Sequence, residues 1–253
     1  MIKVLGIDMY VGNVKLLINE FVDQIKNKTS SKKNHLISVA DAHCLVEANL
    51  NKDFSSILSH FHYVLPDGLP SVWVGRYKGA RGMSRCTGAD TFQTFMELAA
   101  NEPVNHFFCG GKEGIAARLK DTCNHRFNNP HIVGIYTPPF RPLNEMEWSE
   151  LADQINASAA NVVWIGLSSP KQEAFALALS KRVNVDYIIT VGAVFDFFTG
   201  EKKRAPKWMQ ENGLEWFYRL MQEPIRLFPR YGIVVPMFIY LNCKEWLKAR
   251  FGK

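Results

Sequence analysis

The chain has 253 residues, and its 30 lysines and arginines against 24 aspartates and glutamates give a net charge of +6. The whole excess lies in residues 201–253, which hold 11 basic and 5 acidic side chains, whereas the first 200 residues are neutral overall. A neutral body with a basic tail argues against a protein that wraps nucleic acid over its whole surface. It indicates one localised anionic partner.

The hydrophobic content of 47% predicts a sizeable core. The five cysteines are odd in number and form no C-x-x-C pair, so we expect reduced thiols rather than a disulfide framework or a zinc site. We expect no signal peptide, because the first residues lack a charged segment followed by an apolar run. The longest apolar stretch, from Tyr231 to Leu241, has 11 residues, and a membrane-spanning helix needs about 20. This excludes an ordinary transmembrane protein but not one that lies on a membrane.

Short β-branched runs alternate with segments of helical spacing through the first 200 residues. The expected strands are Lys3–Ile7, Leu36–Val39, Tyr63–Leu65, His106–Cys109, Ile132–Ile135, Val162–Gly166 and Tyr187–Val191. The expected helices between them are Asn13–Ile25, Asp90–Ala100, Glu113–Phe127 and Lys171–Arg182. This alternation predicts a Rossmann-like α/β domain over residues 1–200, with a mostly parallel sheet flanked by helices.

Residues 201–253 show no convincing strand and hold 10 of the 31 aromatic side chains. We expect a helix over Lys207–Gln222, a new start at Pro224, and a last helix from about Pro236 to Arg250. The sequence therefore predicts a helical appendage after the α/β domain.

Parallel sheets bind ligands beyond the carboxyl ends of their strands, so the residues that follow each strand are the candidates for a site. Asp67 follows one strand and precedes Gly68, a placement that suits a general base. The alternative is a turn residue or a helix cap. Gly110, Gly111 and Lys112 follow another strand and open a helix, where backbone N–H groups can hold a phosphate.

Three more polar segments follow strands or open helices. Ser168 or Ser169 can cap the helix that starts near Lys171, and Glu173 can close a capping box. Lys171 and Gln172 can still face a ligand in the same crevice. Asp196, in an aromatic run, is either a buried hydrogen-bonded residue or a group that recognises a base or sugar hydroxyl. Arg85 precedes the cap candidates Thr87 and Asp90 and can hold a diphosphate or carboxylate, or simply be solvated.

Other chemistries lack their signatures. No D-x-D pair occurs, and His60 and His62 have no obvious third ligand, so we expect no metal and no cofactor. No G-x-S-x-G elbow is present, and we expect no cysteine to act as a nucleophile.

Taken together, these segments resemble the WecG/TagA/CpsF glycosyltransferase family, also called glycosyltransferase family 26. The match lies in PDG at 66–68, RCTGAD at 85–90, GGK at 110–112, GLSSPKQE at 166–173 and the long block at 190–231. The resemblance implies an inverting, metal-independent enzyme on the cytoplasmic face of the bacterial inner membrane. It implies transfer of a sugar from a UDP-sugar donor to a polyprenyl-diphosphate-linked sugar, in exopolysaccharide or cell-wall polysaccharide assembly.

The resemblance also implies roles for individual residues. Asp67 corresponds to the family's proposed base, and Arg85, Gln172 and Asp196 correspond to its donor-site residues. The appendage of the family supplies arginines to the active site and docks on the membrane, and these arginines correspond to Arg219, Arg226 and Arg230. We assign stabilisation of the departing UDP diphosphate to Arg219 and Arg226 together with residues 110–112.

One segment departs from the family pattern. Many members have a T-x-N triplet after the second strand, whereas this chain has Val39-Ala40-Asp41. Val39 has no hydrogen-bonding side chain, and Asp41 places a carboxylate where the family usually has an amide. The donor is therefore open between UDP-glucose and UDP-N-acetylmannosamine types, and Asp41 becomes a second candidate for acceptor contact or base.

The tail can also bind an anionic membrane surface. We expect Lys244, Lys248, Arg250 and Lys253 to face anionic lipid, with aromatic side chains at the headgroup level (Trp208, Trp216, Phe228, Tyr231, Phe238 and Trp246). The alternative is that the segment packs on the core or on a second subunit, and an exposed aromatic tail is compatible with a homo-oligomer. Two other functions remain open at this stage: a non-catalytic module that binds nucleotide-sugars or anionic lipids, and a soluble UDP-sugar-modifying enzyme such as an epimerase.

Overall fold

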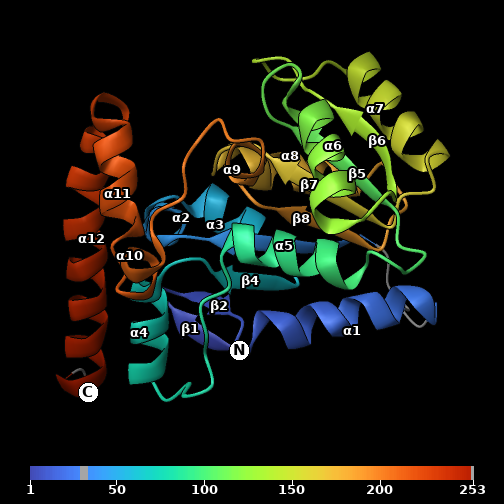
Figure 1. Ribbon diagram of the computed structural model, residues 1–253. Helices are drawn as coiled ribbons and strands as arrows, with labels where there is room; N and C mark the ends of the chain where they lie inside the picture. The colour runs from blue at the N-terminus through green and yellow to red at the C-terminus, as the bar shows by residue number, and fades with distance from the viewer. Residues whose placement is uncertain (29–33, 252–253) are drawn as a thin grey trace.

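The computed structural model describes residues 1–28 and 34–251, which leaves Lys253 outside the described residues. In this part of the chain one sheet has the strand order β1-β2-β4-β3-β8-β7-β5-β6 (Figure 1). The strands are β1 Ile2–Val4, β2 Ile7–Met9, β3 His35–Ala40, β4 Tyr63–Pro66, β5 His106–Gly110, β6 Ile132–Tyr136, β7 Val162–Gly166 and β8 Tyr187–Thr190. Only β1 and β2 pair antiparallel. The predicted α/β class with a mostly parallel sheet is confirmed.

The central strands β3, β4, β5, β7 and β8 are buried on both faces, because side chains alternate across a strand and helices cover each side of the sheet. On β7, Val163 and Ile165 face one hydrophobic cluster, whereas Val162 and Trp164 face the other. The first cluster packs against α2 Ala42–Leu50, α3 Lys52–Leu58, α7 Glu145–Ala157 and α8 Lys171–Ser180. The second packs against α1 Val14–Lys26, α5 Gly88–Leu98, α6 Ile115–Phe127 and α9 Val194–Phe198.

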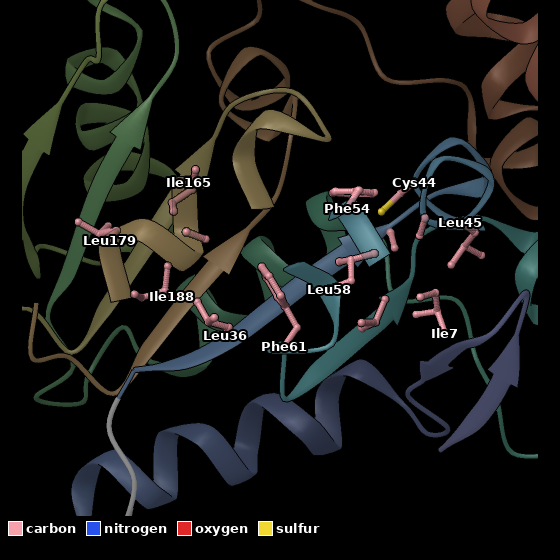
Figure 2. Close-up of a cluster of buried hydrophobic side chains, with 14 of the residues drawn as sticks. Ile7, Leu36, Cys44, Leu45, Phe54, Leu58, Phe61, Ile165, Leu179 and Ile188 are labelled. Atoms are coloured by element: carbon pink, nitrogen blue, oxygen red, sulfur yellow. The ribbon is translucent and has the colours of Figure 1, made fainter. Parts of the chain in front are cut away.

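Figure 2 shows the first cluster at the point where α2 and α3 meet the sheet. Leu45 of α2 lies near Ile7 of β2, Phe54 and Leu58 of α3 lie in the middle of the view, and Leu36 of β3 lies near Ile188 of β8. This packing fixes the start of α2, which follows the carboxyl end of β3. It therefore also fixes Asp41, the residue between the two elements.

The expected single strand Lys3–Ile7 is wrong, because the segment forms a hairpin. Val4 pairs with Ile7 across a two-residue turn in which Leu5 and Gly6 both have positive φ angles, 50° and 85°. Two positive φ angles are the geometry of a tight hairpin turn, and here the first of them falls on a leucine, which is not a typical turn residue. The apolar run conceals the turn for that reason.

The C-terminal helices also differ from the expectation. The expected helix over Lys207–Gln222 is two helices, α10 Lys207–Glu211 and α11 Glu215–Gln222, separated at Gly213, which has a φ of 73°. The last helix starts earlier than expected, because α12 spans Pro224–Phe251 and continues through Pro229 and Pro236. Both prolines are exposed, so the carbonyl groups that they leave unpaired face solvent.

Helix α12 stands at one end of the sheet, with α11 beside it and with α4 Leu69–Tyr77 and α2 toward the core, while α7 lies at the opposite end (Figure 1). Val234 and Phe238 of α12 are buried in the first hydrophobic cluster. The appendage is thus packed on the α/β body along one face. None of the described helices combines the length and the apolar character that a bilayer-spanning segment needs.

Candidate active site

A cleft with a volume of about 1440 Å³ opens where β3, β4, β5, β7 and β8 end and where α11 and α12 approach the sheet. It brings together ten of the eleven residues singled out from the sequence: Asp41, Asp67, Arg85, Gly111, Lys112, Gln172, Asp196, Arg219, Arg226 and Arg230. The eleventh, Gly110, ends β5 and is absent from the lining. Residues separated by up to 189 positions in the chain therefore face one cavity.

Asp67 follows β4 and is partly buried in this cleft. It does not cap α4, because the N-cap is Gly68; instead its Oδ1 accepts a hydrogen bond of 3.1 Å from the backbone N–H of Gly88, the first residue of α5. Burial raises the pKa of Asp67 to about 7, with further increases from the charges of Asp41 and Glu215. The Gly88 hydrogen bond and the charge of Arg219 oppose this increase. A carboxyl group with a pKa near neutrality can take up a proton during a reaction.

Asp41 is the N-cap of α2 and is also paired with the appendage. Its Oδ1 accepts a hydrogen bond of 2.9 Å from the backbone N–H of Cys44, and its Oδ2 lies 3.3 Å from Nη2 of Arg230 on α12. The Asp41 carboxylate is therefore paired with an arginine and still adds negative charge near Asp67. This ion pair ties α12 to the carboxyl end of β3.

The glycines after β5 allow a close approach of two backbones. Gly110 has a φ of 140°, and a Cβ atom there would lie 2.5 Å from the carbonyl oxygen of Gly166 on β7. Gly111 has a φ of 74° and lines the cleft, and Lys112 is exposed beside it. Gly110 thus shapes the loop, while Gly111 and Lys112 face the cavity.

Gln172 lies at the start of α8 and is only 2% exposed. Its Nε2 donates a hydrogen bond of 2.9 Å to Glu173, and its Oε1 accepts one of 3.0 Å from the backbone N–H of Gly192. The expected capping box is wrong, because the N-cap of α8 is Pro170 without a side-chain bond. Glu173 points instead into the interior, where its Oε1 also accepts a hydrogen bond of 3.2 Å from Ser38.

Asp196 and Arg226 lie in a chain of charges at the mouth of the cleft. Lys202 lies 3.2 Å from Oδ2 of Asp196 and 3.2 Å from Oε1 of Glu223, and Glu223 also pairs with Nε of Arg226. The Arg226 side chain is 53% exposed, so solvent or a ligand can reach it. This chain links α9, the following loop and α11–α12.

Arg85 belongs to a second charge cluster that also includes Arg204, Asp90 and Glu215. Arg85 lies 3.5 Å from Glu215 and 3.7 Å from Asp90, and Arg204 lies 3.6 Å from Glu215 and 2.8 Å from Asp90. We call these four residues the latch. The latch joins the segment before α5 to the start of α11 through Glu215. Arg85 also donates a hydrogen bond of 2.9 Å to the carbonyl of Gln210 on α10.

Arg219 differs from these arginines, because it takes part in no ion pair among the residues that the structure describes. Its guanidinium lies 5.8 Å from the centre of the Phe197 ring, and its charge opposes the rise that burial causes in the pKa values of Asp67 and Tyr231. A cation beside the Asp67 carboxylate without a carboxylate of its own is available for an anionic ligand.

Comparison with known proteins agrees with this arrangement. The family described as "Glycosyl transferase WecG/TagA/CpsF family" matches residues 2–252 of the chain.

The chain belongs to the WecG/TagA/CpsF family.

A Bacillus subtilis (strain 168) protein is 28% identical over 224 residues, which cover 86% of each chain. That relative is an N-acetylglucosaminyldiphosphoundecaprenol N-acetyl-beta-D-mannosaminyltransferase. The present WecG/TagA/CpsF protein is accordingly an enzyme, a glycosyltransferase, and the resemblance inferred from its motifs is confirmed.

Several residues of this glycosyltransferase escaped the sequence analysis as parts of the site. Arg204 and Glu215 complete the latch, Lys202 bridges Asp196 to Glu223, and Glu173 anchors Gln172. The charged pairs join positions that are far apart in the chain, so no local sequence pattern predicts them. Glu173 lies within the motif at 166–173, where a role in a capping box was enough to explain the presence of a glutamate.

Within residues 1–28 and 34–251 of this family member, no three histidine, cysteine, aspartate or glutamate side chains are grouped closely enough to hold a metal ion. His62 accepts a hydrogen bond from the backbone N–H of Leu36 through Nδ1, at 3.1 Å. The five cysteines carry free thiols, four of them buried.

Proposed function

We propose that this enzyme transfers a hexose from a UDP-sugar to a sugar that is linked to polyprenyl diphosphate. The observation that carries the proposal is Asp67, a partly buried carboxyl group with a pKa near 7 that faces the cleft beside the cation Arg219. The Bacillus subtilis relative, named for a mannosaminyltransferase that acts on a diphosphoundecaprenol-linked sugar, supports the acceptor class. Family membership supports the glycosyl transfer itself.

The proposed reaction is an inverting displacement with Asp67 as the base. The acceptor hydroxyl attacks the anomeric carbon while its proton passes to the Asp67 carboxylate, and the bond from the anomeric carbon to the UDP oxygen breaks. A base with a pKa near the working pH gives the largest benefit, and a positioned base typically contributes about 10²–10⁴-fold in rate. The raised pKa of Asp67 suits this role.

The departing UDP diphosphate carries negative charge that has to be met. We assign this role to Arg219, Arg226 and the Lys112 side chain, in a metal-independent transfer. The expected backbone contribution is not assigned, because Gly110 lies outside the cleft lining and the backbone N–H of Gly111 donates a hydrogen bond of 3.1 Å to the carbonyl of Gly166. Arg219 has no competing carboxylate among the described residues, and Arg226 is half exposed at the cleft mouth. Gln172 and Asp196 line the same cavity, where we expect them to contribute to the donor site with Arg85.

The donor type remains a choice between UDP-glucose and UDP-N-acetylmannosamine. Val39 and Asp41 both line the cleft, so the departure from the family's T-x-N triplet lies where a substrate binds. Because Arg230 pairs with Asp41, the replaced position presents an ion pair to the acceptor side. The proposal therefore expects a donor or acceptor that differs from that of members with an amide there.

The acceptor lipid stays in the bilayer, so the enzyme has to bind the membrane as a peripheral protein, which we propose occurs on the cytoplasmic face. Helix α12 supports this, because one face is packed on the core while the other exposes Ile225, Phe228, Ile233 and Ile239. Lys244, Lys248 and Arg250 are exposed near its end, and each basic group near an anionic surface contributes about 1 kcal/mol. Phe238, expected at the headgroup level, is buried instead, since it faces the core with Val234.

A donor panel tests the proposal. UDP-glucose, UDP-N-acetylmannosamine and UDP-glucuronic acid are each incubated with a synthetic polyprenyl-diphosphate sugar, and released UDP is measured. We expect release with one donor and only when the acceptor is present. Turnover of a donor without any acceptor would indicate a donor-modifying enzyme and would overturn the proposal, as would the absence of release across a panel of donors and acceptors.

A further inference from the structure

Glu173 is a carboxylic acid buried behind the cleft, with an exposure of 0%. The side chains that donate hydrogen bonds to it are those of Gln172 and Ser38, and neither of them is a cation. Burial outweighs these donors and raises the pKa of Glu173 above its usual value. Burying an acidic side chain without a cation costs more folding free energy than burying an apolar side chain. Its presence indicates a task that an apolar side chain does not perform.

The first part of that task is visible in the orientation of the neighbouring amide. Oε1 of Glu173 accepts the hydrogen bond of Nε2 of Gln172, at 2.9 Å, so the opposite atom of the amide, Oε1, faces Gly192. An amide side chain has one donating and one accepting end, and a partner at one end decides which atom faces the other way. Glu173 thus selects the amide orientation in which Gln172 receives the backbone N–H of Gly192.

Gly192 begins the loop that enters α9 after β8. It has a φ of 64°, a conformation that favours glycine, and the following residues, from Ala193 to Phe197, line the cleft and include Asp196. The hydrogen bond from Gly192 to Gln172 holds this turn against α8. The position of Asp196 is therefore linked to Glu173 through one amide group.

The other donor to Glu173 comes from β3. Ser38 is fully buried and its hydroxyl reaches Oε1 of Glu173 at 3.2 Å, three residues before Asp41 enters the cleft. One carboxyl oxygen thus joins the β3–α2, β7–α8 and β8–α9 connections, which all contribute residues to the cavity.

We propose that Glu173 is a positioning residue, which acts through Gln172 and Gly192 to fix the donor side of the cleft. It does not contact the substrate itself. The inference rests on the proposed function only in taking the bound ligand to be a nucleoside diphosphate. Its consequence is that loss of the acceptor oxygen at position 173 weakens nucleotide binding without removing the base, Asp67.

Two substitutions separate positioning from packing. Glu173→Gln keeps an acceptor oxygen for Gln172 and Ser38, whereas Glu173→Met fills a similar volume without one. We expect the Kd for UDP, measured by calorimetry, to rise at least 10-fold in Glu173→Met and by less than about 3-fold in Glu173→Gln. We expect kcat at saturating donor to change less than the Kd in both.

A second readout needs no nucleotide. Hydrogen exchange in the peptide that covers residues 190–198 of the free enzyme is expected to accelerate in Glu173→Met, because Gly192 loses its held partner, and to remain near wild type in Glu173→Gln. Faster exchange combined with a wild-type enzyme that binds no UDP would refute the proposed donor class and leave the positioning role standing. Unchanged exchange and unchanged UDP affinity in Glu173→Met would refute the positioning role.

Leu179→Ala is the matched control, because Leu179 is buried on the same helix but belongs to the hydrophobic cluster. It should lower the melting temperature and leave the Kd for UDP unchanged. Equal losses in Glu173→Gln and Glu173→Met would show that hydrogen-bond acceptance is irrelevant and would overturn the inference. If Glu173→Met does not fold, Ser38→Ala tests the same link, with a rise of about 3-fold in the Kd expected and an unchanged Kd contradicting it.

Discussion

The pKa of Asp67 depends on surroundings that can be changed one at a time. Burial raises it most, the carboxylates Asp41 and Glu215 raise it further, and Gly88 and Arg219 lower it. Because the base has to be ionised, we expect kcat to fall as the pH drops below about 7. The acidic limb of the pH–rate profile therefore reports the environment of this one side chain.

Asp41→Asn restores the amide that the family usually carries and removes one of the charges that raise the pKa of Asp67. Asparagine caps helices as well as aspartate does, so the hydrogen bond to Cys44 and the fold should persist. We expect the acidic limb of kcat to move to lower pH by about one unit. Asp153→Asn, an exposed change on α7, is the control and should leave the limb in place. A limb that does not move in Asp41→Asn would show that Asp41 does not act on Asp67.

At the scale of elements, the latch holds α11 in register with the α/β body. Glu215 forms ion pairs with both Arg85 and Arg204, and Arg219 follows one helical turn later on the same helix. Glu215→Gln removes the charge that both arginines share while keeping the size of the side chain. We expect a loss in kcat of about 10-fold, comparable to one or two charge-assisted hydrogen bonds, with faster proteolysis of the segment between α9 and α10.

Glu211→Gln serves as the matched change, since Glu211 is exposed at the end of the neighbouring helix α10. It should leave both kcat and proteolysis at wild-type values. A fully active Glu215→Gln variant with an equally resistant loop would show that the latch does not position Arg219.

Local patterns predict the strands and amphipathic helices of this molecule well, because burial on two faces imposes a clear apolar signal. These patterns give wrong predictions where the tertiary structure decides the local conformation. The turn at Leu5 lacks typical turn residues, and α12 continues through Pro229 and Pro236 because both lie on its exposed face. The helices α2, α3, α4, α7 and α9 were not among the expected elements, and in α2 and α4 the apolar side chains are not confined to one face.

The site shows the same division. Strand-end motifs such as those of Asp67 and Gly111 lie where a parallel sheet predicts a ligand, and the structure brings them into one cleft. The partners of these residues could not be predicted, because pairs such as Asp41–Arg230 and Arg204–Asp90 depend on how the appendage docks. The sequence around Glu173 is consistent with a helix cap, whereas the structure shows that its side chain points into the interior.

At the scale of the whole molecule, the basic side chains of the tail fall into two groups. Arg219, Arg226 and Arg230 line the cleft, while Lys244, Lys248 and Arg250 are exposed near the end of α12. The proposed function therefore assigns helix α12 two roles, one at a cavity for an anionic substrate and one at an anionic lipid surface. Deleting the helix would also remove Val234 and Phe238 from the core, so point changes are the better probe of its outer face.

Ile225→Ser with Phe228→Ser alters two side chains that are 94% and 68% exposed, so folding should be preserved. We expect the double variant to lose most of its pelleting with vesicles that contain anionic lipid, because about 1.5–3 kcal/mol is gained by each large apolar side chain that is fully buried. Met146→Ser, near the start of α7 on the opposite side of the molecule from α12, removes a side chain that is 69% exposed and should pellet like wild type. Equal pelleting of all three proteins would remove α12 from membrane binding.

The base assignment is tested most directly by Asp67→Asn, assayed for UDP binding by calorimetry and for UDP release in the presence of the lipid-linked acceptor. Asparagine preserves the shape of the side chain and an oxygen for the Gly88 hydrogen bond, but it cannot take up the acceptor proton. We predict a Kd for UDP within about 3-fold of wild type and a turnover that is lower by about 10²-fold or more. Near-normal turnover in Asp67→Asn would contradict the role of Asp67 as the base.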